Sequence, residues 1–165
     1  HTNKLLHLDI KPANIYIRND ITPVLIDFGA ARQTLTAEGF KLNPMYTPGF
    51  ASPEHYQKRE ILGPWSDIYS IGASIFACLA GAAPQAADLR VEKDRYVSAT
   101  KIFADKYSDQ LLETIDWCLQ LDHSKRPHSV MALQKVLLHE KDPEGPSRRS
   151  FVTNLRGALG RLARR

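Results

Sequence analysis

Two short segments near the start of the chain carry oxygen-bearing side chains that could act on a phosphate. Residues 7–14 contain Asp9 and end at Asn14, and an Asp-Phe-Gly run begins at Asp27. Transfer of a phosphoryl group needs a carboxylate that accepts the proton of the attacking hydroxyl, and it needs oxygen ligands for magnesium. The types and spacing of these three residues therefore predict phosphoryl-transfer chemistry.

A local element has to hold Asn14 and Asp27 at a constant separation. Two β-rich runs, residues 15–17 and 24–26, are separated by a turn-rich stretch. This pattern predicts a small hairpin that connects the two candidate metal ligands. After it, residues 30–53 lack a sustained period and contain Gly and Pro, which indicates a long functional loop.

From Pro64 onward the pattern of apolar residues becomes helical. Spacings of three and four predict three main helices, with Ser66 as the N-cap of the first. Residues 81–106 are ambiguous and would hold one or two short helices. The three main helices are expected over residues 68–79, 111–118 and 130–137.

Charge and composition exclude one class of partner. A chain of 165 residues, 43% hydrophobic and 24% charged, is enough for one soluble domain with a core. The net charge is +4, but residues 141–165 carry seven Lys and Arg against two acids, so the body of the chain is close to neutral. The body gives no electrostatic argument for nucleic-acid binding, and we expect no nucleic acid as a partner.

The two cysteines, Cys78 and Cys118, predict a reducing compartment. Both lie in apolar stretches without a paired Cys or His at a metal-like spacing, which favours buried thiols over a disulfide. No signal peptide is visible, and the most apolar segment, residues 68–87, is interrupted by Ser, Gly and Pro as in a buried helix. We therefore expect a cytoplasmic protein.

The order of these motifs resembles the C-terminal lobe of a eukaryotic-type (Hanks-type) Ser/Thr protein kinase, in the short form of bacterial members, over about residues 5–139. The resemblance implies an α+β fold, mainly α, in which a short β-hairpin carries the catalytic and metal-binding loops. It implies that Asp9 orients the substrate hydroxyl and accepts its proton, and that Lys11 neutralises the transferring phosphate. Asn14 and Asp27 would hold magnesium and, with Lys11, bind ATP.

The resemblance also assigns residues that hold the site together. Thr47, in the segment that receives the substrate, would hydrogen-bond the catalytic aspartate and lysine and is placed with them among the catalytic residues. Glu54 would form a buried ion pair with Arg126. Asp67 would bind the backbone of the catalytic loop, and His7 would be a buried structural histidine that braces it.

Leu8 departs from the family pattern. Members that are regulated by loop phosphorylation have arginine immediately before the catalytic aspartate, and this chain has Leu8 there. A phosphate on Thr34, Thr36 or Thr47 would lack that guanidinium as its partner. We infer that activity is not switched by this device.

The remaining aromatic and histidine side chains are expected to be structural. Two tryptophans, Trp65 and Trp117, would be core anchors rather than binding platforms. Four further histidines share no metal-ligand spacing and are expected at the surface or at helix caps. These are His55, His123, His128 and His139.

We divide the chain at residue 140. Residues 1–140 would form a partial kinase domain without its ATP-binding N-terminal lobe, so either the chain is a piece of a longer protein or a partner covers the apolar face of the helix at residues 68–79. Residues 141–165 would form a basic linker and an amphipathic helix with four apolar residues on one face. That helix could dock on anionic lipid or on an acidic partner, or be a solvated linker.

The sequence leaves three functions open. In the first, which we favour because all the candidate residues are intact, the chain is the catalytic half of a Ser/Thr protein kinase that uses ATP and Mg²⁺ on a protein substrate. In the second, it is a non-catalytic kinase-derived binding module, since no glycine-rich loop or strand lysine is present. In the third, it is a small-molecule phosphotransferase, a class that typically lacks a segment like residues 47–54.

Overall fold

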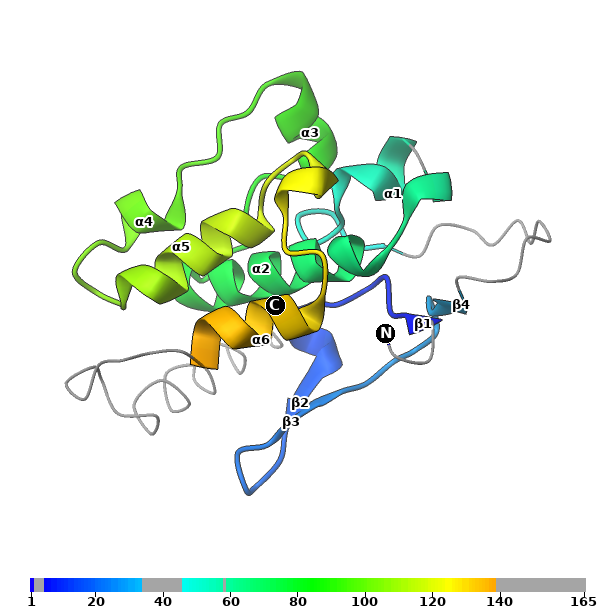
Figure 1. Cartoon of the computed structure of the whole chain (residues 1–165), viewed down its shortest axis with the longest axis horizontal. Coiled ribbons are helices and arrows are strands. Elements are labelled where there is room, and N and C mark those ends of the chain that lie inside the picture. The colour runs from blue at the N-terminus through cyan, green and yellow to red at the C-terminus, as the bar shows by residue number, and fades with distance from the viewer. Residues whose placement is uncertain (2–4, 34–45, 58, 139–165) are drawn as a thin grey trace.

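The computed structural model describes residues 1, 5–33, 46–57 and 59–138, and it shows a mainly helical fold with two short pairs of strands (Figure 1). The predicted tail helix at residues 141–165, His139, and the candidate phosphorylation sites Thr34 and Thr36 lie outside the described residues. The strands are β1 (Leu5–Leu6), β2 (Ile15–Ile17), β3 (Pro23–Leu25) and β4 (Arg32–Gln33). The helices are η1 (Pro12–Asn14), α1 (Pro53–Gln57), η2 (Arg59–Ile61), α2 (Pro64–Ala80), α3 (Ala87–Glu92), α4 (Ala99–Ile102), α5 (Asp109–Cys118), η3 (His123–Lys125) and α6 (Val130–Leu138).

The predicted hairpin is confirmed. Strands β2 and β3 pair antiparallel, with Tyr16 opposite Val24, and the second strand begins one residue earlier than predicted, at Pro23. The pairing continues to the base of the hairpin, where the Ile26 N–H donates to the Asn14 carbonyl oxygen at 2.9 Å. The hairpin therefore brings the end of η1 beside the residue that precedes Asp27.

Helix α2 is the central element, and its N-terminus differs from the prediction. The N-cap is Gly63, Pro64 is the first helical residue, and Ser66 lies inside the first turn, where its Oγ accepts from the Gly63 N–H at 3.3 Å. Ser66 is therefore wrong as the N-cap, because Pro64 already has the backbone angle of a first helical residue. At the other end Gly81 has φ +77° and its N–H donates to the Ala77 carbonyl, a left-handed cap that glycine adopts without strain.

The core lies between α2 and the helices on either side of it (Figure 1). At Gly72 a Cβ atom would come within 2.5 Å of the Cys118 Cβ, so the absence of a side chain lets α2 and α5 pack closely. The three predicted helices are confirmed, and residues 81–106 contain two short helices, α3 and α4. The main core cluster consists of Tyr69, Ala73, Phe76, Ala87, Ala99, Phe103, Leu112, Ile115 and Leu119.

The thiols are free, as predicted. Cys118 is buried and Cys78 half-buried, and burial raises the pKa of Cys78 to about 11 and that of Cys118 to about 12. Both thiols are therefore protonated and unreactive at neutral pH. In the described part of the chain, no helix is long and apolar enough to cross a membrane.

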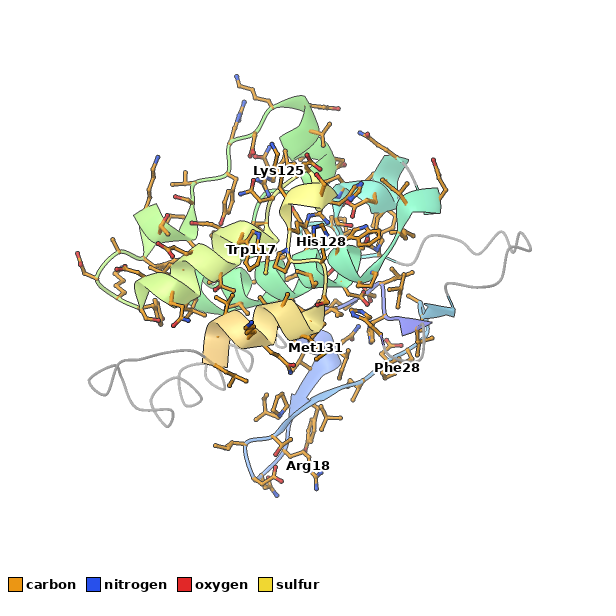
Figure 2. The ribbon with its side chains drawn as sticks, viewed as in Figure 1. Arg18, Phe28, Trp117, Lys125, His128 and Met131 are labelled. Atoms are coloured by element: carbon orange, nitrogen blue, oxygen red, sulfur yellow. The ribbon has the colours of Figure 1, made fainter. Side chains whose placement is uncertain are left out.

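Exposed apolar side chains lie on a different element from the one expected. The predicted bare face of α2 is partly covered, because Ile71 packs beside α6 and Ile75 joins the main core cluster. Large exposed side chains lie toward the hairpin, where Tyr16 is 58% exposed and Phe28 52%, on α6, where Met131 is 76% exposed, and along the α3–α4 segment. Phe28 and Met131 lie on the hairpin side of the molecule (Figure 2).

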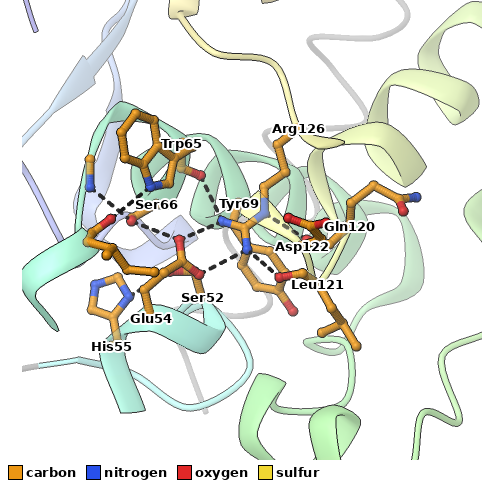
Figure 3. A network of polar contacts seen from close by, with 12 residues as sticks. Ser52, Glu54, His55, Trp65, Ser66, Tyr69, Gln120, Leu121, Asp122 and Arg126 are labelled. Carbon is orange, nitrogen blue, oxygen red and sulfur yellow. Dashed lines mark hydrogen bonds and ion pairs between the residues drawn. The ribbon is translucent and has the colours of Figure 1, made fainter. Parts of the chain in front are cut away.

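A buried ion pair joins α1 to the segment after η3 (Figure 3). Two parallel bonds of 2.9 Å run from the Arg126 guanidinium to the carboxylate oxygens of Glu54, and this confirms the predicted pair. An arginine has five N–H donors, and here all five are engaged. The other three contacts are with the carbonyl oxygens of Trp65, Gln120 and Leu121.

The electrostatics of this pair favour the charged form. Burial alone would raise the pKa of Glu54, but the hydrogen bonds and the charge of Arg126 outweigh it and hold the pKa below its ordinary value. The Ser66 hydroxyl donates to the same carboxylate at 3.1 Å. Both ions are thus satisfied in the interior, which is the condition for a buried pair to be tolerated.

Replacing Arg126 by Met should lower the free energy of unfolding at pH 7 by about 3 to 5 kcal/mol, because Glu54 would stay buried without its counter-ion. The folded-state pKa of Glu54 is depressed in the natural chain, so the stabilisation is present above its unfolded pKa and is lost as the pH falls. Urea denaturation at pH 7 and below pH 4 should show the gap between variant and natural chain narrowing in acid. Lys125→Met, at the exposed neighbouring position, is the control and should change stability by less than about 0.5 kcal/mol.

Candidate active site

The loop at residues 7–11 has little regular structure and is held by a carboxylate of the central helix. Asp67 is 1% exposed, and its two oxygens accept the N–H groups of His7 and Leu8, each at 2.8 Å. Burial raises the pKa of Asp67, and the two backbone donors oppose this shift. The predicted contact between Asp67 and the backbone of the loop is confirmed.

Leu8 is in the left-handed region of backbone conformation, with φ +67°. A leucine there is strained, and such conformations persist only where the surroundings hold them. Its side chain is 5% exposed, its N–H is bound by Asp67, and its carbonyl oxygen lies 3.2 Å from Nε2 of His55. The backbone N–H and the carbonyl group of Leu8, the residue before Asp9, are therefore both held by hydrogen bonds.

His55 is buried, so its predicted place at the surface or at a helix cap is wrong. It is 5% exposed, and its Nδ1 lies 2.9 Å from the Ser52 hydroxyl. Because the Leu8 carbonyl can only accept, Nε2 must carry the hydrogen and Nδ1 accepts from Ser52. Burial lowers the pKa of His55, which keeps this neutral form at pH 7. Its partner lies 47 positions away, so no local spacing could have revealed the contact.

The other described histidines match the prediction more closely. His7 is 4% exposed, and its two ring nitrogens lie near the Asp9 N–H, at 3.4 Å, and near the Ile26 carbonyl, at 3.1 Å. It therefore braces the loop against the end of the hairpin, as predicted. The His123 ring stacks on the Trp65 ring, with 5.5 Å between the ring centres. Both residues are half-buried, so this contact lies at the edge of the core.

Four of the five predicted site residues form one connected polar cluster. Lys11 Nζ donates to Asp9 Oδ2 at 2.7 Å and to Thr47 Oγ1 at 2.8 Å. Thr47 Oγ1 in turn donates to Asp9 Oδ1 at 2.8 Å. Asn14 Nδ2 donates to the Asp9 carbonyl at 2.9 Å and to its Oδ2 at 3.2 Å. The predicted bonds of Thr47 to both residues are confirmed.

The fifth residue, Asp27, lies at the base of the hairpin. Its side chain is exposed, it has φ +61°, and its Oδ1 accepts from the Gly29 N–H at 3.2 Å. The preceding residue, Ile26, donates to the Asn14 backbone, so Asn14, just before β2, and Asp27, just after β3, lie at the same end of the hairpin. In the described structure Asp27 makes no direct hydrogen bond to the four-residue cluster.

The donor set fits a magnesium ion that also binds phosphate. Asn14 uses its amide nitrogen on Asp9, and within the described residues its Oδ1 accepts no hydrogen bond. Mg²⁺ prefers such oxygen ligands and is usually held by one or two protein groups together with substrate phosphates. Among the residues described, no three His, Cys, Asp or Glu side chains gather as a metal site of their own. By their chemistry, the side-chain oxygens of Asn14 and Asp27 could hold magnesium together with the phosphates of a nucleotide.

A family model described as the protein kinase domain matches residues 1–138. This match covers most of the chain and all five predicted site residues. The chain belongs to the protein kinase family. The predicted fold class, a mainly helical kinase-like fragment with a small sheet, is thereby confirmed.

Named relatives in this family are Ser/Thr protein kinases. The chain is 30% identical to human death-associated protein kinase 2 over an alignment of 175 positions that covers 100% of this chain and 47% of the relative. It is 30% identical to serine/threonine-protein kinase C of Synechocystis over 83% of this chain and 26% of the relative, and 39% identical to PknA of Nostoc over 52% and 16%. These matches support a Hanks-type Ser/Thr kinase.

A solved structure gives the same result for the fold. The apo form of PpkA-294 superposes with a TM-score of 0.66 and 34% identity, over 80% of this chain and 46% of the solved chain. The chain thus spans less than half the length of that structure and of the human relative.

Replacing His55 by Leu should loosen the turn before Asp9, because the Leu8 carbonyl and the Ser52 hydroxyl would both lose a buried partner at a cost of about 1 to 3 kcal/mol. His55→Gln, whose amide nitrogen can still reach the Leu8 carbonyl, should lose less. Hydrogen exchange at the Leu8 and Asp9 amides measures the loosening, and faster exchange is expected for Leu than for Gln. Equal exchange in the natural chain and the Leu variant would show that His55 does not hold the turn.

Proposed function

We propose that this chain carries the catalytic residues of a Ser/Thr protein kinase, which transfers the terminal phosphate of ATP to a Ser or Thr hydroxyl of a protein. The observation that carries the proposal is the cluster of Asp9, Lys11 and Thr47, in which each side chain contacts the other two within 2.8 Å. Family membership alone would allow an inactive relative. A preserved contact set of this kind favours an active one.

Asp9 would orient the substrate hydroxyl and accept its proton. Its side chain is 12% exposed, and its two oxygens already accept from Thr47, Lys11 and Asn14. These donors restrict the carboxylate to one orientation, so a hydroxyl that reaches it meets a positioned base. Thr47 would couple this orientation to the segment that receives the substrate.

Lys11 would stabilise the negative charge on the transferring phosphoryl group. Its side chain is 25% exposed and its ammonium lies 2.7 Å from Asp9, so it would be available to a phosphate that meets a hydroxyl at Asp9. A cation positioned before the reaction lowers the barrier, because no solvent has to reorganise around the developing charge. In the family, a lysine two residues after the catalytic aspartate is typical of Ser/Thr kinases, which supports that acceptor class.

Asn14 and Asp27 would hold Mg²⁺, which neutralises phosphate charge when it is bound with ATP. Both residues lie at the open end of the hairpin, one before β2 and one after β3, so the strand register sets their separation. Family members also contact ATP through a glycine-rich loop and a strand lysine. Neither motif occurs in these 165 residues, so we propose that ATP turnover requires these elements to be supplied with the chain.

A non-catalytic binding module is the second candidate. Exposed apolar side chains on the hairpin side and on α6, among them Phe28 and Met131, favour it because exposed apolar groups are suited to contact with a partner. Whether the chain is catalytic or only binds, we propose that it acts on or binds a protein and that it is located in the cytoplasm. We also propose that the basic residues 141–165 bind anionic lipid or an acidic partner.

The purified chain alone should show no magnesium-dependent ATP turnover, and fusion to the ATP-binding lobe of a related kinase should produce phosphorylation of a protein. In the fusion, Asp9→Asn should lower the rate by about 10²- to 10⁴-fold, because it removes the base. Asp20→Asn, which makes the same chemical change on the exposed hairpin turn, is the control and should leave the rate unchanged. A fusion that folds but stays inactive would favour the binding module, and phosphate transfer only to small molecules would contradict a protein substrate.

Phosphorylation of the loop after the hairpin should not activate the fusion. Leu8 is 5% exposed and stands where regulated relatives have arginine, so no guanidinium is available there for the phosphate. Thr34→Asp and Thr36→Asp should change the rate by less than about twofold in a kinase assay with a peptide substrate. An increase of tenfold or more would show that another cation replaces the missing arginine.

A further inference from the structure

A cavity of about 530 Å³ lies remote from the candidate active site. It is formed by the α3–α4 segment, the end of α5 and η3, which lie across α2 from the hairpin (Figure 1). Lys125 marks this side of the molecule, and Arg18 and Phe28 mark the opposite side (Figure 2). None of its lining residues belongs to the cluster around Asp9.

One wall of the cavity is rigid because a buried arginine crosses it. Arg90 is 4% exposed, and two parallel bonds of 3.0 and 3.1 Å join its guanidinium to Asp94. The same guanidinium donates to the Tyr69 hydroxyl and to the Leu119 carbonyl, and it lies 4.5 Å from the centre of the Tyr96 ring. The charge of Arg90 is therefore satisfied internally and is not available to a ligand.

The other two carboxylates of the lining are also engaged. Asp116 accepts four hydrogen bonds, from the Tyr96 hydroxyl, the Ala99 N–H, and the N–H and hydroxyl of Thr100. Asp122 Oδ1 accepts from the N–H and the hydroxyl of Ser124 at 2.9 and 2.7 Å. These bonds hold the segment before α4 and the turn of η3 in place, so the cavity is formed before any ligand enters.

Two lysines are left without such partners. Lys101, from α4, and Lys125, from η3, both line the cavity and are exposed, and in the described part of the chain neither makes an ion pair. Val97 lines the same cavity and is 52% exposed. The lining thus offers two ammonium ions from different elements and one exposed apolar side chain, and the charge of Lys125 also acts on Asp122.

We propose that this cavity is a docking site for an acidic segment of a protein partner, with a carboxylate or phosphate between Lys101 and Lys125 and an apolar neighbour on Val97. Three cations and three carboxylates line it, so its long-range field is weak and recognition acts at short range. Nucleic acid would need a longer basic surface. If the proposed kinase function holds, the partner would be a substrate or regulator that binds this cavity in addition to the active site. Binding to the cavity itself does not depend on catalysis.

Fluorescence anisotropy with labelled twelve-residue peptides tests the site without ATP. One peptide alternates Glu and Leu, a second replaces the central Glu by phosphoserine, and a third replaces every Glu by Lys. The acidic peptides should bind and the Lys peptide should not, and their relative affinities show whether carboxylate or phosphate is preferred. Lys101→Glu and Lys125→Glu should each weaken binding about tenfold, whereas Lys106→Glu, an exposed lysine outside the cavity, should change it less than twofold.

The basic tail can attract the same peptides, but it is common to all variants, so the comparison among them reports on the cavity. Amide chemical-shift changes on the full chain should concentrate at Val97 and Gln120. Equal weakening by Lys106→Glu, shift changes confined to the tail or to the loop around Lys11, or equal binding of the Lys peptide would overturn the proposal. Inorganic phosphate that displaces the peptides at their own concentration would indicate a small-anion site and would also overturn it. A chain inactive as a kinase can still pass this test.

Discussion

The candidate site depends on one buried carboxylate that belongs to a helix and binds a loop. The segment around Asp9 has no ladder of its own, so its backbone donors need an acceptor from elsewhere. Asp67 supplies it with both oxygens, and Asp67 lies on α2, the helix around which α5 and α6 pack. The position of the candidate base is therefore a consequence of core packing. A change deep in α2 would move the loop without touching it.

A second set of buried polar groups extends this support to the substrate side. The pair of Glu54 with Arg126 holds α1 against the segment between η3 and α6, and His55, the residue after Glu54, reaches the Leu8 carbonyl. Each of these groups loses hydration on burial and is tolerated because its partners are complete. The strain of Leu8 is then held from both sides, by Asp67 and by His55, which fits the tendency of strained backbone to occur at functional sites.

Residues within a local pattern or a motif could be predicted from the sequence, and isolated long-range partners could not. The hairpin followed from β-rich runs, and Thr47, Glu54, Asp67 and Arg126 followed from the family's motif order. Ser66 was misplaced as an N-cap because Pro64 competes for the same helix start. His55 was missed, since its partners are a hydroxyl three residues before it and a carbonyl far upstream. The cavity near Lys101 gave no signal either, because its walls come from four separate elements.

The contacts that build the site differ in sequence separation, and therefore in how much of the chain must be synthesised before each can form. The hairpin that carries Asn14 closes through its own neighbours, and hairpins of this size form in about 1–10 μs. The hydrogen bond from the His7 N–H to Asp67 joins residues 60 positions apart, and the ion pair of Glu54 with Arg126 joins residues 72 positions apart. During synthesis the candidate metal ligands Asn14 and Asp27 can therefore come together before Asp67 binds the loop that contains Asp9. Assembly of the site is complete only after the ribosome has delivered the segment that contains Arg126.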